Sequence, residues 1–158
     1  MTPSADNPLA APGLPAHSAV GFGAMDDVHA EFGPLLNRLL AAGDGELPAA
    51  LRAVTDHCRM HFALEEEWMG TDFPGRECHA QEHAAVLASL DGVMLRLQGG
   101  EAQPARTVAR ALQDWFPPHV QHLDSALAHW LCKQRWGAKP VVLHLRPRAD
   151  EGHAATAA

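Results

Sequence analysis

Two pairs of potential metal ligands lie close together in the sequence, and each pair is spaced by four residues. His61 and Glu65 form the first pair, and His79 and His83 form the second. Side chains at positions i and i+4 lie on the same face of an α-helix, one turn apart. Imidazole and carboxylate groups together suit first-row transition metals such as iron and manganese. Two such helical turns on neighbouring helices could therefore hold two metal ions.

Apolar residues that recur at intervals of three and four positions predict four helices around these pairs. The expected helices cover about residues 26–42, 45–72, 79–97 and 104–136. Short connections between them predict an all-α fold, an antiparallel up-down-up-down four-helix bundle. Bundles of this kind build metal sites in their core from inward-facing side chains on several helices.

Residues that favour helix ends set these boundaries. Asp26 or Asp27 can cap the first helix, and Asp44 can cap the second. The turn at residues 73–75 is expected to stop the second helix. Pro117 and Pro118 lie in the middle of the fourth helix and remove two backbone donors, so we expect a kink or break there.

The domain organisation follows from composition. A chain of 158 residues is about one domain, which we place at residues 20–137. Residues 1–19 are rich in Pro, Ala, Gly and Ser and predict a flexible N-terminal arm. Residues 138–158 form a C-terminal extension, whose end we expect to be disordered.

Bulk properties exclude several classes of partner. A net charge of -7 argues against nucleic acid and against anionic membrane surfaces, and no apolar stretch approaches membrane-spanning length. The three cysteines form no CxxC pattern, and the N-terminus shows no secretory signal. We therefore expect reduced thiols and a cytoplasmic protein; a protein partner is left open.

Each expected helix contributes at least one candidate ligand to the interior. A lone histidine on an apolar face is more often a hydrogen-bonded core residue than a ligand, and a single HxxxE or HxxxH is a weak signal. Eleven histidines against no tyrosine is an unusual composition, however. Seven candidates in order on four helices are a strong signal: His29, His61, Glu65, His79, His83, His119 and Asp124.

The order and spacing of these seven residues resemble the hemerythrin family, in particular its bacterial single-domain type. The matching stretches are residues 25–29, 61–66, 79–83 and 115–124, within a region from about 20 to 131. The resemblance implies a non-haem di-iron centre. It implies one iron bound by His79, His83 and His119, and a second bound by His29 and His61. Glu65, Asp124 and a solvent-derived oxygen would bridge the two ions.

The same resemblance implies reversible binding of dioxygen, for storage, delivery or sensing, at an open position on the iron with two histidines. One alternative is a di-iron oxidoreductase of the peroxidase type. Another is an iron- or oxygen-sensing module that acts through a separate partner. The HxxxxD spacing on the fourth helix favours the oxygen-binding type, so an enzyme is the less expected reading. Manganese or mixed metals remain open.

Three aromatic residues flank the candidate ligands. Phe62, Trp115 and Phe116 would be core aromatics in any case, but beside a metal pair they predict a dry, narrow pocket for dioxygen. The family commonly has an aliphatic residue after the tryptophan, so Phe116 departs from its pattern. Oxygen access and the rate of iron oxidation are therefore left open.

Two further histidines compete with the chosen ligands. His57 lies one turn before His61 and could be a spare ligand, but a core or supporting role is the better reading. His122 could replace His119, yet only His119 keeps the five-residue step to Asp124 that the family shows. On an ideal helix five residues leave two side chains about 140° apart around the axis. We therefore expect an irregular helix, such as a π-bulge, between residues 115 and 124.

Overall fold

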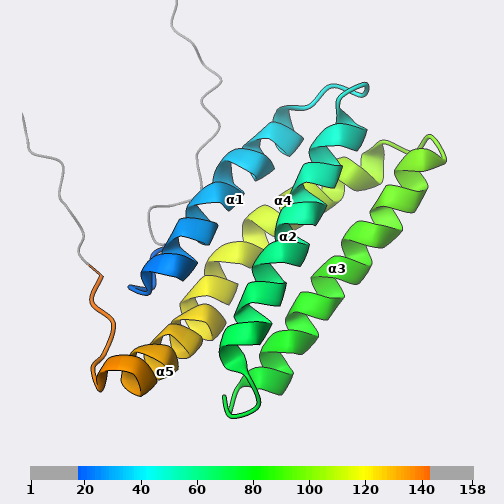
Figure 1. Ribbon diagram of the computed structural model, residues 1–158. Coiled ribbons are helices and arrows are strands. Elements are labelled where there is room, and N and C mark those ends of the chain that lie inside the picture. Colours follow the sequence, from blue (N-terminus) through cyan, green and yellow to red (C-terminus); the bar gives the residue numbers. More distant parts are fainter. Residues whose placement is uncertain (1–17, 143–158) are drawn as a thin grey trace, which may run out of the picture.

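The computed structural model describes residues 18–142, which form four helical rods packed side by side (Figure 1). The first three rods are α1 (Gly23–Ala41), α2 (Leu47–Met69) and α3 (Arg76–Gln98). The fourth is a continuous run of α4 (Gln103–His119), the π-helical segment η1 (Val120–Asp124) and α5 (Ser125–Trp136). These residues contain no strand, so the predicted all-α class is confirmed.

Each rod packs against two neighbours. Helix α1 contacts α2 and α4, and α3 contacts α2 and α4, so the four rods close into a bundle. Short connections reverse the chain after each of the first three rods, as the up-down-up-down prediction requires. The predicted flexible arm and disordered C-terminal end lie outside the described residues, except for positions 18 and 19 and the start of the extension.

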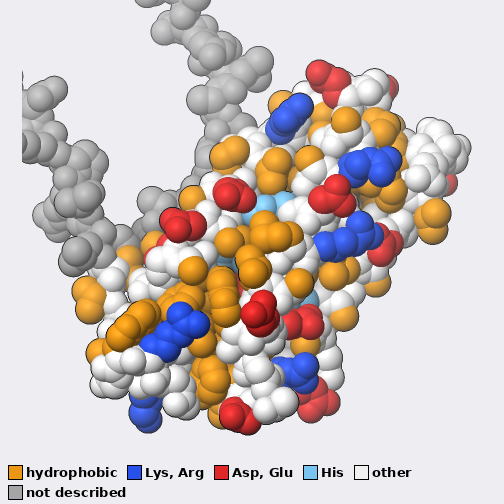
Figure 2. All heavy atoms as spheres, viewed as in Figure 1, with side chains coloured by type: hydrophobic (Ala, Val, Ile, Leu, Met, Phe, Trp, Pro, Cys, Tyr) orange, Lys and Arg blue, Asp and Glu red, His pale blue; other side chains and the backbone are white. Residues whose placement is uncertain are grey.

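The apolar faces of the helices meet in a closed core. Burying one large apolar side chain stabilises a fold by about 1.5–3 kcal/mol, so this packing supplies most of the stability. The largest side chains with almost no exposed surface include Phe32, Leu36, Leu39, Leu47, Leu51, Met69, Leu90 and Leu127. On the face shown in Figure 2, acidic and basic side chains alternate with apolar ones and histidine is scarcely visible. No helix among the described residues is long and apolar enough to cross a membrane.

Helix α1 begins three residues earlier than the sequence predicted. The first helical residue is Gly23, and the backbone carbonyl of Phe22 already accepts hydrogen bonds from the N–H groups of Met25 and Asp26. Asp26 therefore lies inside the first turn rather than before it. Its carboxylate accepts bonds from the N–H groups of Val20 (2.6 Å) and Gly21 (3.1 Å), so it fixes the segment leading into the helix.

Both boundaries of α2 also differ from the prediction. The residue before the helix is Glu46, whose carboxylate accepts a bond from the Gly43 N–H, and Asp44 instead pairs with Arg106 on α4 at 2.7 Å. The helix ends at Met69, before the 73–75 turn, because Gly70 adopts a φ of +52°. Glycine adopts this conformation without the steric cost that other residues incur.

Replacing Asp26 should loosen the segment before α1. In Asp26→Ala the two N–H groups lose their carboxylate acceptor, and we expect the free energy of unfolding to fall by about 0.5–2 kcal/mol, as for a lost helix cap. The neighbouring Asp27 is exposed, so Asp27→Ala serves as the matched control and should change stability by less than about 0.5 kcal/mol. Chemical denaturation followed by circular dichroism measures both; equal losses would contradict the assigned role of Asp26.

Candidate metal centre

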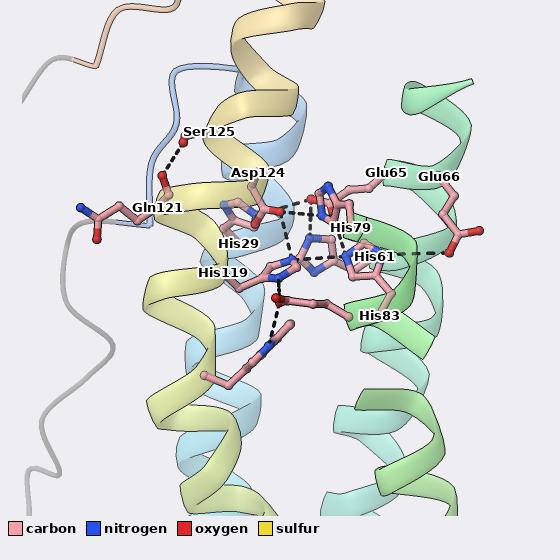
Figure 3. Close-up of polar contacts among 12 residues, drawn as sticks. His29, His61, Glu65, Glu66, His79, His83, His119, Gln121, Asp124 and Ser125 are labelled. Carbon is pink, nitrogen blue, oxygen red and sulfur yellow. Dashed lines mark hydrogen bonds and ion pairs between the residues drawn. The ribbon is translucent and has the colours of Figure 1, made fainter. Parts of the chain in front are cut away.

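The seven predicted ligands lie together at one level of the bundle interior. All four rods contribute, and the side chains point toward one another (Figure 3). Each of the seven residues is at most 3% exposed, whereas the competing His122 is exposed on the surface. The structure therefore brings together this set: His29 from α1, His61 and Glu65 from α2, His79 and His83 from α3, His119 from α4 and Asp124 from η1.

The seven side chains form two groups that share both carboxylates. In each group the nitrogen and oxygen atoms that could bind a metal all lie within 4.8 Å of one another. The three-histidine group contains His79, His83 and His119 with the two carboxylates, and the two-histidine group contains His29 and His61 with the same two carboxylates.

The two oxygens of Glu65 face different histidine groups. Oε1 lies 3.0 Å from Nε2 of His61 and 3.8 Å from Nε2 of His29, both in the two-histidine group. Oε2 lies 3.3 Å from Nε2 of His79 and 3.2 Å from Nε2 of His83, both in the three-histidine group. The carboxylate thus spans the space between the groups.

Asp124 divides its oxygens in the same way. Its Oδ2 lies 3.1 Å from Nε2 of His29, in the two-histidine group. Its Oδ1 lies 3.0 Å from Nε2 of His79 and 3.1 Å from Nε2 of His119, in the three-histidine group. Two carboxylates arranged in this manner present one oxygen each to two neighbouring positions.

A π-helical turn brings His119 and Asp124 to the same site. The backbone N–H of Ser125 donates to the carbonyl of Val120, five residues earlier, where an α-helix would use a residue four earlier. The wider turn offsets the angular separation that a five-residue step would otherwise produce. The irregularity expected between residues 115 and 124 is present.

The predicted kink at Pro117 and Pro118 was wrong in position. Helix α4 continues through both prolines to His119, and the irregular turn follows immediately after them. Proline removes a backbone donor but has a φ that fits a helix, so two prolines can lie in the rod while the chain stays helical.

Two hydrogen-bond acceptors that orient site histidines were not predicted from the sequence. The Nδ1–H of His29 donates to the backbone carbonyl of Ser18 at 2.7 Å, and the Nδ1–H of His119 donates to the carboxylate of Glu82 at 2.9 Å. The position of Glu82 within the HxxxH stretch was a usable signal. A backbone carbonyl such as that of Ser18 leaves no signal in residue types.

The buried atoms of the site lack the partners that polar groups normally have. Nε2 of His29 and of His79, Oε2 of Glu65 and both carboxylate oxygens of Asp124 are buried without a hydrogen-bond partner. Buried polar groups are almost always satisfied, and an exception calls for an explanation such as an ion. Converging imidazole nitrogens and carboxylate oxygens are ligands that transition metals accept, so the residues fit a metal pair.

The pKa values of the site histidines and carboxylates are shifted by their close approach to one another. Burial lowers the pKa of His29, but the nearby carboxylates of Asp124 and Glu65 outweigh this effect and raise the pKa to about 10. Burial also lowers the pKa of His79, but the nearby carboxylates of Asp124 and Glu65 outweigh it and raise this pKa to about 9. Burial opposes ionisation of the two carboxylates as well, yet the surrounding histidines leave the pKa of each carboxylate below its usual range. Without metal, protons on histidine compensate the buried negative charge.

Aromatic rings line both sides of the site. Phe62 stacks on His83 with a centroid distance of 3.9 Å and an interplanar angle of 4°, and the ring of Trp115 lies 4.3 Å from that of His119. On the other side, the rings of Phe116 and His29 are perpendicular, with a centroid distance of 5.4 Å. Phe62 and Phe116 are buried, so the three predicted pocket residues form a largely apolar wall around the polar centre.

His57 lies outside both groups of ligands. It is 6% exposed, stacks on Phe32 at 5.8 Å and lies 5.7 Å from the ring of His61. Burial, together with the charges of His61 and His29, lowers the pKa of His57 to about 4. A neutral imidazole packed between rings is a core residue of the bundle.

Fold and site together define a class of protein: a four-helix bundle with a buried histidine–carboxylate metal site. Comparison with known proteins supports this class. The family model "Hemerythrin HHE cation binding domain" matches residues 20–131. A bacteriohemerythrin from Ralstonia nicotianae is 36% identical over 116 residues, which cover 73% of this chain and 85% of the relative. No solved structure matches the chain significantly. The chain belongs to the hemerythrin family, as the resemblance in sequence predicted.

Metal binding should release protons from this site. At pH 7 the metal-free chain holds protons on His29 and His79, because both pKa values lie above 7, and a metal must displace them. We expect about two protons to be released at pH 7, fewer as the pH rises through 9 and 10, and weaker metal binding as the pH falls. Calorimetric titration in buffers of different ionisation enthalpy counts the protons. Binding without proton release at pH 7 would contradict the protonation scheme.

Proposed function

We propose that the protein holds a non-haem di-iron centre and binds dioxygen there reversibly, for storage, delivery or sensing. The arrangement of Glu65 and Asp124 supports this most strongly, because each carboxylate directs one oxygen to each histidine group. Membership of the hemerythrin family, whose domain is described as cation-binding, supports the metal, and similarity to a bacteriohemerythrin supports iron and dioxygen.

The proposed ligands follow the two groups. His79, His83 and His119 would bind one iron, and His29 and His61 would bind the other. Glu65 and Asp124 would bridge the pair. When bound, two ferrous ions supply the two electrons that dioxygen takes up and returns. The two-histidine group offers one imidazole fewer, and such an incomplete set leaves a position for a small ligand.

The protein's own residues control what reaches that position. Phe116 is 1% exposed and lies against both His29 and the ring of Phe32, at 5.4 and 4.5 Å between centroids. These rings exclude water and place apolar surface beside the two-histidine group. A small uncharged molecule can approach such an apolar surface at little cost, whereas a charged species would lose its hydration.

The spectrum of the iron-loaded protein tests the proposal directly. After anaerobic reduction, addition of air should produce a stable oxygenated spectrum that returns to the reduced one under vacuum. Rapid bleaching to the ferric form would contradict reversible binding and would favour the peroxidase-like or sensing alternatives.

The cytoplasmic location stays a prediction from the sequence.

Removing either shared carboxylate should abolish the pair. We expect Glu65→Ala and Asp124→Ala each to hold fewer than two irons per chain, because each change removes an oxygen from both metal positions. His57→Ala is the matched control: it also removes a buried polar side chain one or two turns from the site, yet it should keep its iron. Elemental analysis measures the content. Two irons retained in Glu65→Ala would contradict the bridging assignment.

A further inference from the structure

The carboxylate of Glu82 connects a site histidine to an aromatic ring beside it. Glu82 lies on α3 between His79 and His83, and its side chain is 45% exposed. Its Oε2 accepts hydrogen bonds from Nδ1–H of His119 at 2.9 Å and from Nε1–H of Trp115 at 3.2 Å. Both partners lie on α4. One surface residue therefore ties α3 to α4 at the level of the buried site.

The bond to Glu82 determines which nitrogen of His119 is free. The proton that a carboxylate accepts lies on Nδ1, so Nε2 of the neutral ring carries a lone pair. That Nε2 lies 3.1 Å from Oδ1 of Asp124 and 3.3 Å from Nε2 of His83, directed into the three-histidine group. A charged acceptor on the far nitrogen raises the basicity of an imidazole ligand and fixes its orientation.

Three other histidines of the site lack such a partner among the described residues. Nδ1 of His29 donates to a neutral carbonyl, and Nδ1 of His79 is buried without a hydrogen-bond partner. The carboxylate of Glu66 lies 4.0 Å from Nδ1 of His83, too far for a hydrogen bond. The charged contact from Glu82 thus distinguishes His119 from these three.

We propose that Glu82 is a positioning residue of the di-iron site, which strengthens His119 as a ligand and holds Trp115 against its ring. Its negative charge, transmitted through the imidazole, favours the oxidised state of the iron that His119 binds. The inference rests on the proposed function, because it concerns the iron pair. It adds a residue that touches no metal and yet sets the redox balance of one side of the centre.

Three variants of the iron-loaded chain separate the hydrogen bond from the charge. Glu82→Gln keeps an oxygen that can accept from His119 but removes the charge; Glu82→Ala removes both. Glu66→Gln is the matched control, because its carboxylate is also 45% exposed and lies near a site histidine without bonding to it. The measurements are the midpoint potential of the centre and the rate at which reduced protein loses iron to a chelator.

We expect Glu82→Gln to retain iron as the wild type does, with a more positive midpoint potential. Glu82→Ala should bind iron about 10- to 100-fold more weakly, as seen when a partner of a metal-bound histidine is lost, and should release it correspondingly faster. Glu66→Gln should match the wild type in both measurements.

The role of Glu82 would be overturned, with the proposed function intact, by an unchanged potential in Glu82→Gln or by iron release from Glu82→Ala at the wild-type rate. An equal shift of potential in Glu66→Gln would also overturn it, because any nearby charge would then suffice. A wild-type chain that holds no iron pair would contradict the proposed function itself, and this inference with it. The iron content of the wild-type chain therefore distinguishes a failure of the proposed function from a failure of the role of Glu82 alone.

Discussion

The burial of two carboxylates among five imidazoles is the constraint on which the rest of the structure depends. Glu65 and Asp124 are 0% exposed, and an ionised carboxylate loses several kcal/mol of hydration when it leaves water. Opposite charge at close range offsets much of that cost. Protons on His29 and His79 supply it in the metal-free chain, and metal ions would supply more. The apolar core excludes water around the site, so the compensating charge must be bound there.

The bundle meets this constraint with regular helices and one irregular turn. On α2 and α3 a four-residue step places two ligands on the same face, and no distortion is needed. The fourth rod uses a five-residue step, and the π-helical turn at η1 makes it fit. A second adaptation lies before α1, where Asp26 fixes the backbone that leads back to Ser18, the acceptor for His29. Ligand orientation thus depends on backbone features as much as on ligand identity.

The helices and the seven clustered residues were predictable because both follow from spacing. Apolar periodicity located four helices, and ligand types at helical intervals located the site on α2 and α3. The resemblance to the hemerythrin family selected His119 over His122. Helix ends were less predictable: Asp44 had the right type for a cap but pairs with Arg106, since local preference gave way to a contact between helices. Glu82 was missed, although it lies inside the HxxxH stretch, because its contact with His119 depends on how α3 faces α4. The role of Pro117 and Pro118 was misjudged, because the irregular turn begins after them.

The central claim is that two irons lie between the rods, joined by two shared carboxylates. Anomalous X-ray diffraction at the iron edge, from crystals of the iron-loaded protein, tests it most directly. The account predicts two peaks of similar height, one beside His79, His83 and His119 and one beside His29 and His61, with Glu65 and Asp124 reaching both. A single peak, or iron found only at the surface of the bundle, would contradict it.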